Sequence, residues 1–140
     1  MNYMDIIQFW YTEITPRNWF MKDLGFDAML KRRFSHIHQQ AVAGELSSWR
    51  SKPLGQLAEI IVLDQFSRNL FRNSPQTFAY DGQALVLAQT AIAKQADLVL
   101  EPLQKAFLYM PFMHSESAII HQQAMQLFNQ PGLEDNYKLK

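Results

Sequence analysis

Apolar residues recur at helical spacing along most of this 140-residue chain, and no stretch shows the alternation of a half-buried strand. The clearest example covers residues 26–41, where Leu30, Phe34 and Ile37 fall on one helical face. Gly44 stands where the C-terminal cap of this helix is expected. The pattern therefore predicts an all-α fold.

The prolines predict where helices begin and end. Pro16 is expected to end the first helix, and Pro53 and Pro102 suit the first turn of two later helices. Asp81 is expected to cap the helix between them, because aspartate side chains accept hydrogen bonds from free N–H groups at helix starts. Pro111 is expected to interrupt the helix that starts at Pro102.

A final helix is expected over residues 115–130. About six antiparallel helices joined by short connections then form an array similar to tetratricopeptide helix hairpins. Residues 1–132 are expected to form a single domain, because this length supports one hydrophobic core and is too short for two. Residues 133–140 are expected to be a frayed tail.

Composition and charge exclude several classes of protein. The 13 basic and 13 acidic residues balance, which argues against nucleic acid or an anionic membrane as the main partner. The absence of cysteine excludes disulfides and thiol chemistry. The N-terminal residues lack a basic leader, and no segment approaches the roughly 18 apolar residues of a membrane span. We therefore expect a soluble, cytoplasmic protein.

The stretch "IIVLDQFSRNLFR", residues 60–72, places charges on an apolar helix. Asp64 lies on the same face as its apolar neighbours, and Arg68 follows at i+4, the spacing of a helical ion pair. Arg72 continues this stripe, and Asn69 belongs to a parallel polar row. A structural ion pair is the commoner explanation. The alternative is that the arginines and Asn69 bind an anionic ligand while Asp64 positions them.

A second polar cluster, "HSES", covers residues 114–117. After the expected break at Pro111, a serine cap and Glu116 near a helix start explain it without chemistry. The functional interpretation makes His114 an acid or base that Glu116 orients. No metal site is predicted, because His114 and His121 are about 10 Å apart along a helix. No cofactor is expected, since phosphate-binding glycine loops are absent from the sequence.

Several segments together, above all "IIVLDQFSRNLFR" and "FLYMPFMHSES", resemble the bacterial family of unknown function DUF924. The resemblance runs from Ile6 to about Phe128 and implies an all-α, tetratricopeptide-like fold. It implies no activity, because the family has no established one. The motif positions in this sequence are Asp64, Gln65, Phe66, Arg68, Asn69, Phe71, Arg72, Tyr109, Pro111, Phe112, His114, Ser115 and Glu116.

Two departures from the family pattern bear on the site. Many relatives have proline at the position of Ser67, which would bend or end the helix after Phe66 and weaken the pairing of Asp64 with Arg68. Relatives also continue into a further helical segment, whereas this sequence stops at Lys140. The resemblance thus implies that a polar pocket here could be partial, or that a bare apolar patch could favour a homo-oligomer.

Three functions are compatible with these residues. The leading hypothesis is a module that binds a small anionic ligand or a peptide end. The alternative is a hydrolase-like enzyme with His114 as general base, which requires His114 and Arg68 within reach of one substrate. The third is a structural or protein-interaction domain without a small-molecule site. The candidate ligand-binding residues are Asp64, Arg68, Asn69 and Arg72, and the candidate catalytic residues are His114 and Glu116.

Overall fold

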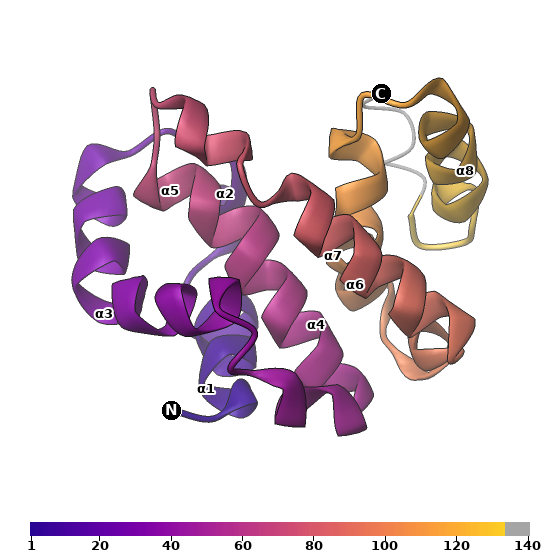
Figure 1. The fold of residues 1–140 in the computed structure, drawn as a ribbon, viewed down its shortest axis with the longest axis horizontal. Helices are drawn as coiled ribbons and strands as arrows, with labels where there is room; N and C mark the ends of the chain where they lie inside the picture. The colour runs from indigo at the N-terminus through magenta and orange to yellow at the C-terminus, as the bar shows by residue number, and fades with distance from the viewer. Residues whose placement is uncertain (134–140) are drawn as a thin grey trace.

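The computed structural model describes residues 1–133, and its regular elements are all helices (Figure 1). The all-α prediction is therefore confirmed over the described residues. Several short helices stand beside the longer ones, and two π-helical segments, η1 and η3, each continue an α-helix. The α-helices are α1 Tyr3–Gln8, α2 Pro16–Phe20, α3 Leu24–Val42, α4 Pro53–Ile61, α5 Ser67–Leu70, α6 Asp81–Ala93, α7 Pro102–His114 and α8 Ala118–Phe128. The π segments are Phe9–Glu13 and Val62–Phe66, and the 3-10 segments η2, η4 and η5 are Ser47–Ser51, Pro75–Phe78 and Ala96–Val99.

The centre of the fold is the continuous helical stretch formed by α4, η3 and α5. Residues 55–67 are all buried, and α1, α6 and α7 pack against α4 (Figure 1). A helix whose residues are buried on all sides lies inside the protein, and this stretch buries polar residues together with its apolar ones. Gly55 allows the close approach at its start, because a Cβ there would come within 1.9 Å of the Trp49 carbonyl oxygen.

Most helix boundaries follow the residues that predicted them. Gly44 has a positive φ of 77° just after α3, as a glycine cap requires. Pro53 and Pro102 occupy the first positions of α4 and α7. Pro16 follows the first helical segment as expected, but it also opens α2. Asp81 is the first residue of α6 rather than its cap, which is Tyr80.

The expected interruption at Pro111 is wrong. Helix α7 continues through Pro111 to His114, and α8 starts only at Ala118. A proline inside a helix costs about 3 kcal/mol. The burial of residues 106–112 and the packing of α7 against α6 and α8 offset this cost. As a consequence, His114 lies at the end of a helix instead of near the start of one.

The remaining expectations concern the C-terminal residues, membrane spans, helix pairing and oligomeric state. Leu133 is fully buried, and the rest of the expected tail, residues 134–140, lies outside the described residues. No described helix is long and apolar enough to cross a membrane. The tetratricopeptide-like pairing and the homo-oligomer stay predictions.

Candidate functional site

The π-helical segment η3 places Asp64 and Gln65 together inside the protein. Both residues are buried, Asp64 completely. A π-helix holds one more residue in a turn than an α-helix, and single π turns occur frequently at functional sites. The wider turn lets two adjacent side chains interact, and the Gln65 Nε2 donates to Asp64 Oδ2 at 2.8 Å.

The closest side-chain partner of Asp64 on another helix is His114. The distance from Asp64 Oδ1 to His114 Nδ1 is 2.8 Å, and it joins η3 to the end of α7. An ionised carboxylate can only accept, so Nδ1 carries the hydrogen, and the neutral ring presents Nε2 as an acceptor. The expected orientation of His114 by Glu116 is therefore replaced by orientation by Asp64.

Arg68 lies near Asp64, as the i+4 spacing predicts, but its main partner is elsewhere. Its Nη1 is 3.6 Å from Asp64 Oδ1 and donates to the Asp64 carbonyl oxygen at 2.7 Å. Two further bonds, of 3.0 and 3.2 Å, join Nη1 and Nη2 to the carboxylate of Asp81 on α6. The Nε hydrogen and one Nη2 hydrogen of Arg68 have no partner among residues 1–133.

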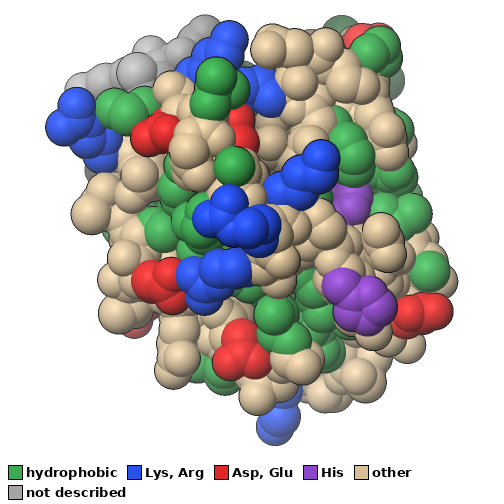
Figure 2. Space-filling view, turned by 90° about the vertical axis from the view of Figure 1, so that its left-hand side faces the viewer, with side chains coloured by type: hydrophobic (Ala, Val, Ile, Leu, Met, Phe, Trp, Pro, Cys, Tyr) green, Lys and Arg blue, Asp and Glu red, His purple; other side chains and the backbone are tan. Residues whose placement is uncertain are grey.

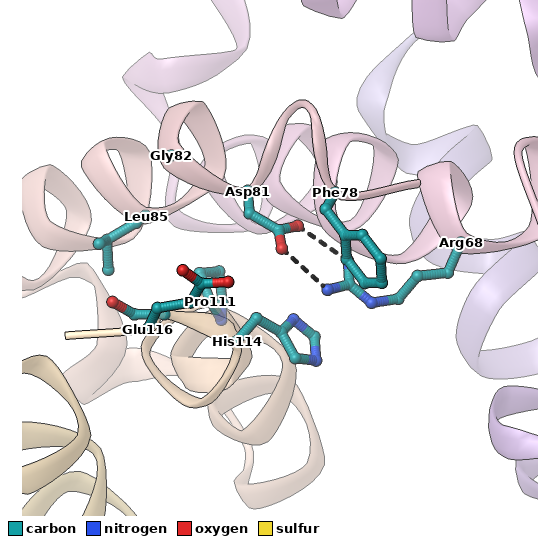
Figure 3. Close-up of a pocket in the computed structure, with 9 residues that line it drawn as sticks. Arg68, Phe78, Asp81, Gly82, Leu85, Pro111, His114 and Glu116 are labelled. Carbon is teal, nitrogen blue, oxygen red and sulfur yellow. Dashed lines mark hydrogen bonds and ion pairs between the residues drawn. The ribbon is translucent and has the colours of Figure 1, made fainter. Parts of the chain in front are cut away.

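His114 and Arg68 share one pocket of about 580 Å³ (Figure 3). It opens between the end of α5, the start of α6 and the end of α7, and the ring of Phe78 lies over the Arg68 guanidinium, 5.9 Å away. The pocket therefore combines polar groups that can bind a ligand with an apolar wall. Its lining residues are Arg68, Phe78, Asp81, Gly82, Leu85, Pro111, His114, Ser115 and Glu116.

Of the four predicted ligand-binding residues, only Arg68 lines this pocket, and Asn69 and Arg72 have a different partner. Both bond to the carboxylate of Asp27 on α3, Asn69 through Nδ2 at 2.9 Å and Arg72 through Nε and Nη2. The bond to Asp27 also raises the pKa of Arg72 further above its usual value. These residues connect α3 to α5 and to the turn that follows it.

The face that includes α3 carries charges of both signs. Figure 2 shows Lys and Arg side chains gathered near its centre with Asp and Glu side chains among them. Arg33 of α3 pairs with Glu13, and Arg72 pairs with Asp27. Arg33 and Arg72 are therefore each neutralised by an acidic partner.

Ser67 does not end the helix in this protein. It begins α5 directly after η3, and its hydroxyl lies 2.8 Å from His38 Nε2 and donates to the Leu63 carbonyl oxygen. Burial lowers the pKa of His38 to about 4, so this histidine is neutral inside the protein. No sequence signal distinguished His38 from an exposed histidine on α3.

The structure also brings together three possible metal ligands that the sequence did not predict as a group. Asp64, Asp81 and His114 each present an atom, and these atoms lie within 4.8 Å of one another. Residue spacing does not predict this set, because its side chains come from three helical segments that are distant in the sequence. The Arg68 guanidinium lies between the two carboxylates and supplies positive charge there.

The sequence matches the model of a bacterial protein family of unknown function, DUF924, over residues 6–140. The chain belongs to the DUF924 family. A solved structure of a protein of unknown function from Agrobacterium tumefaciens is similar, with a TM-score of 0.87 and 33% sequence identity. The match covers 98% of this chain and 81% of that one. No curated protein matches the sequence.

In this DUF924 protein the two polar motifs meet at one pocket. The first motif contributes Arg68 and, behind the pocket wall, Asp64, while the second contributes His114, Ser115 and Glu116. Four lining residues lie between the two motifs in the sequence and were not predicted as site residues. Their pattern looks like the start of an ordinary helix and its apolar face. They are Phe78, Asp81, Gly82 and Leu85.

Proposed function

We propose that the DUF924 pocket binds a small ligand through an anionic group of that ligand. The observation that supports the proposal most is the hydrogen bond of 2.8 Å between buried Asp64 and His114, beside the unpartnered donors of Arg68. Asp64 fixes the imidazole ring, so that Nε2 stays available. When protonated, Nε2 donates to an anion together with Arg68.

A purely structural role explains fewer of these features. A structural ion pair needs no space beside it, yet His114 and Arg68 both border a pocket of about 580 Å³. The π turn that carries Asp64 is a less favourable helical geometry, and such turns are frequent at functional sites. These two observations favour binding over stability alone.

The test uses 4-methylpentanoate, a carboxylate whose branched chain suits the apolar wall. A ligand at about 100 times its dissociation constant stabilises a protein by roughly 2.7 kcal/mol, which a thermal unfolding midpoint detects. The variant His114→Asn keeps an N–H near the position of Nδ1, for Asp64, and removes Nε2. We expect the midpoint shift in the original protein and in the exposed-site control His121→Asn, and no shift in His114→Asn.

A second variant separates the contribution of Arg68. Arg68→Gln removes the guanidinium, and Arg32→Gln removes an exposed arginine of α3 that does not line the pocket. We expect weaker probe binding in Arg68→Gln alone. Equal binding of the probe by the original protein, His114→Asn and Arg68→Gln would overturn the proposed function.

The same Asp64–His114 pair favours a second candidate, an acid–base enzyme. A carboxylate on Nδ1 orients a histidine and stabilises the ring that forms when Nε2 accepts a proton. His114 and Arg68 line one pocket, which this alternative requires. A panel of small esters and amides tests it. Turnover that disappears in His114→Asn supports the enzyme, and turnover equal in both proteins excludes His114 as its base.

A further inference from the structure

The pocket is lined by acidic side chains as well as by the groups that can bind an anion. Arg68 is already neutralised in part by two bonds to Asp81. Glu116 lines the same pocket, is exposed, and forms no hydrogen bond or ion pair with any residue in the described range. A ligand with only negative charge gains nothing from Glu116, whereas a ligand that also carries a positive group pairs with it through that group.

Arg68 and Glu116 do not adjoin each other in the pocket, because His114 and Asp81 lie between them in Figure 3. An α-amino acid carries its ammonium and carboxylate on one carbon atom. A dipeptide carries these two groups at opposite ends of an extended chain, which can run past the intervening His114 and Asp81.

We infer that the ligand is a short zwitterionic peptide of about dipeptide size, with its carboxylate at Arg68 and His114 and its ammonium at Glu116. This rests on the proposed function, because the carboxylate occupies the anion-binding end described above. The apolar residues Phe78 and Leu85 border the same space and suit the peptide's side chains. A volume of about 580 Å³ leaves room for both.

The experiment is a calorimetric titration with alanyl-leucine, N-acetyl-alanyl-leucine and leucine. Each is titrated into the original protein, Glu116→Gln and Glu45→Gln. Glu45 is exposed and does not line the pocket, so it is a matched control for the loss of one carboxylate. Acetylation removes the peptide's positive charge and leaves its carboxylate unchanged.

We expect acetylation to weaken binding about tenfold in the original protein and in Glu45→Gln, which corresponds to the loss of one charge-assisted hydrogen bond. In Glu116→Gln the free and acetylated dipeptides should bind within about twofold of each other, because the acetyl group then removes no ion pair. Leucine should bind more weakly than the free dipeptide.

Three results would overturn the inference. Equal binding of the free and acetylated dipeptides by the original protein would show that no cationic group is recognised, while loss of both in His114→Asn would leave the proposed function standing. Leucine binding as tightly as the dipeptide, with the same dependence on Glu116, would contradict the peptide length. No binding of either dipeptide would reject the peptide, and the 4-methylpentanoate titration would still test the anion site independently.

Discussion

Glu59 and Asp64 lie on one continuous helical stretch, and neither side chain is accessible to solvent. Within residues 1–133, Arg50 alone pairs with Glu59, with Nε and Nη2 at 2.8 and 2.7 Å from its two oxygens. Asp64 instead divides its oxygens between Gln65 and His114. Both oxygens of Glu59 thus bond to one arginine, whereas Asp64 positions a histidine whose Nε2 stays available for a ligand.

The difference shows that a charge within an apolar helix does not identify a site. Both carboxylates would look alike in a sequence search for buried acidic residues. The two carboxylates differ in where their partners lie. His114, the partner of Asp64, borders the pocket, and Arg50, the partner of Glu59, does not. Each prediction below changes one side of this comparison, and the expected effects decrease in order.

Replacing Asp64 should have the largest effect. Asp64→Ala leaves the His114 Nδ1 hydrogen and the buried Gln65 amide without their acceptor, so we expect a loss of about 4 kcal/mol in the free energy of unfolding. Urea unfolding measures it. Binding of 4-methylpentanoate should also disappear in any Asp64→Ala protein that stays folded. A loss below 1 kcal/mol would contradict the role of Asp64 in holding η3 and α7 together.

Replacing Glu59 should be somewhat less costly and should leave the pocket intact. The Arg50 side chain is 35% exposed, so it can turn towards water when its partner is lost. We expect Glu59→Ala to lower the free energy of unfolding by about 3 kcal/mol. Probe binding should match that of the original protein. Loss of probe binding in Glu59→Ala would contradict the difference that we draw between Glu59 and Asp64.

His38 extends the comparison to a buried histidine whose partner is not a carboxylate. Its partner is the Ser67 hydroxyl, so no carboxylate compensates its charge, and burial lowers its pKa from 6.5 to about 4. The unfolded chain binds this proton first as the pH falls. Neutral His38 therefore makes its full contribution to the free energy of unfolding above pH 6.5. This contribution decreases by about 2 to 3 kcal/mol as the pH falls towards 4.

Unfolding by urea between pH 4 and 7 measures this effect. His38→Gln removes the titrating group and keeps an atom that can bond to Ser67. The exposed His36→Gln is the control. We expect a flatter pH dependence only in His38→Gln, and equal slopes in all three proteins would contradict the burial of an uncompensated histidine.

The smallest effect concerns Arg72, which was expected in the ligand site. Asp27 keeps its bond to Asn69 when Arg72 is shortened, so Arg72→Ala should cost about 1 kcal/mol of stability. The affinity for 4-methylpentanoate should stay unchanged, because Arg72 does not line the pocket. A large loss of affinity would show that Arg72 does contribute to ligand binding.

Local signals predicted much of the fold. The apolar periodicity predicted α3, proline predicted the starts of α4 and α7, and Gly44 predicted the end of α3. The predicted helix break at Pro111 was wrong, because the packing of buried α7 outweighs the helix-breaking tendency of proline. Such packing is a property of the whole fold and cannot be read from neighbouring residues.

The site was predictable only where its residues lie close in sequence. The spacing of Asp64 and Arg68 placed them together, and the structure agrees. The bond from Asp64 to His114 spans 50 positions and the bond from Arg72 to Asp27 spans 45, so helical spacing carries no information about either. Asp81 looked like a helix cap, and only the tertiary arrangement shows that it neutralises Arg68.

The most direct measurement of the difference between Asp64 and Glu59 is nitrogen-15 NMR of the His114 ring. In the neutral ring we expect hydrogen on Nδ1 and an acceptor at Nε2, and we expect the Nε2 signal to shift when 4-methylpentanoate is added. Asp64→Asn should alter the ring signals, and Glu59→Gln should leave them unchanged. Hydrogen on Nε2 in the original protein, with no response to the probe, would contradict the account.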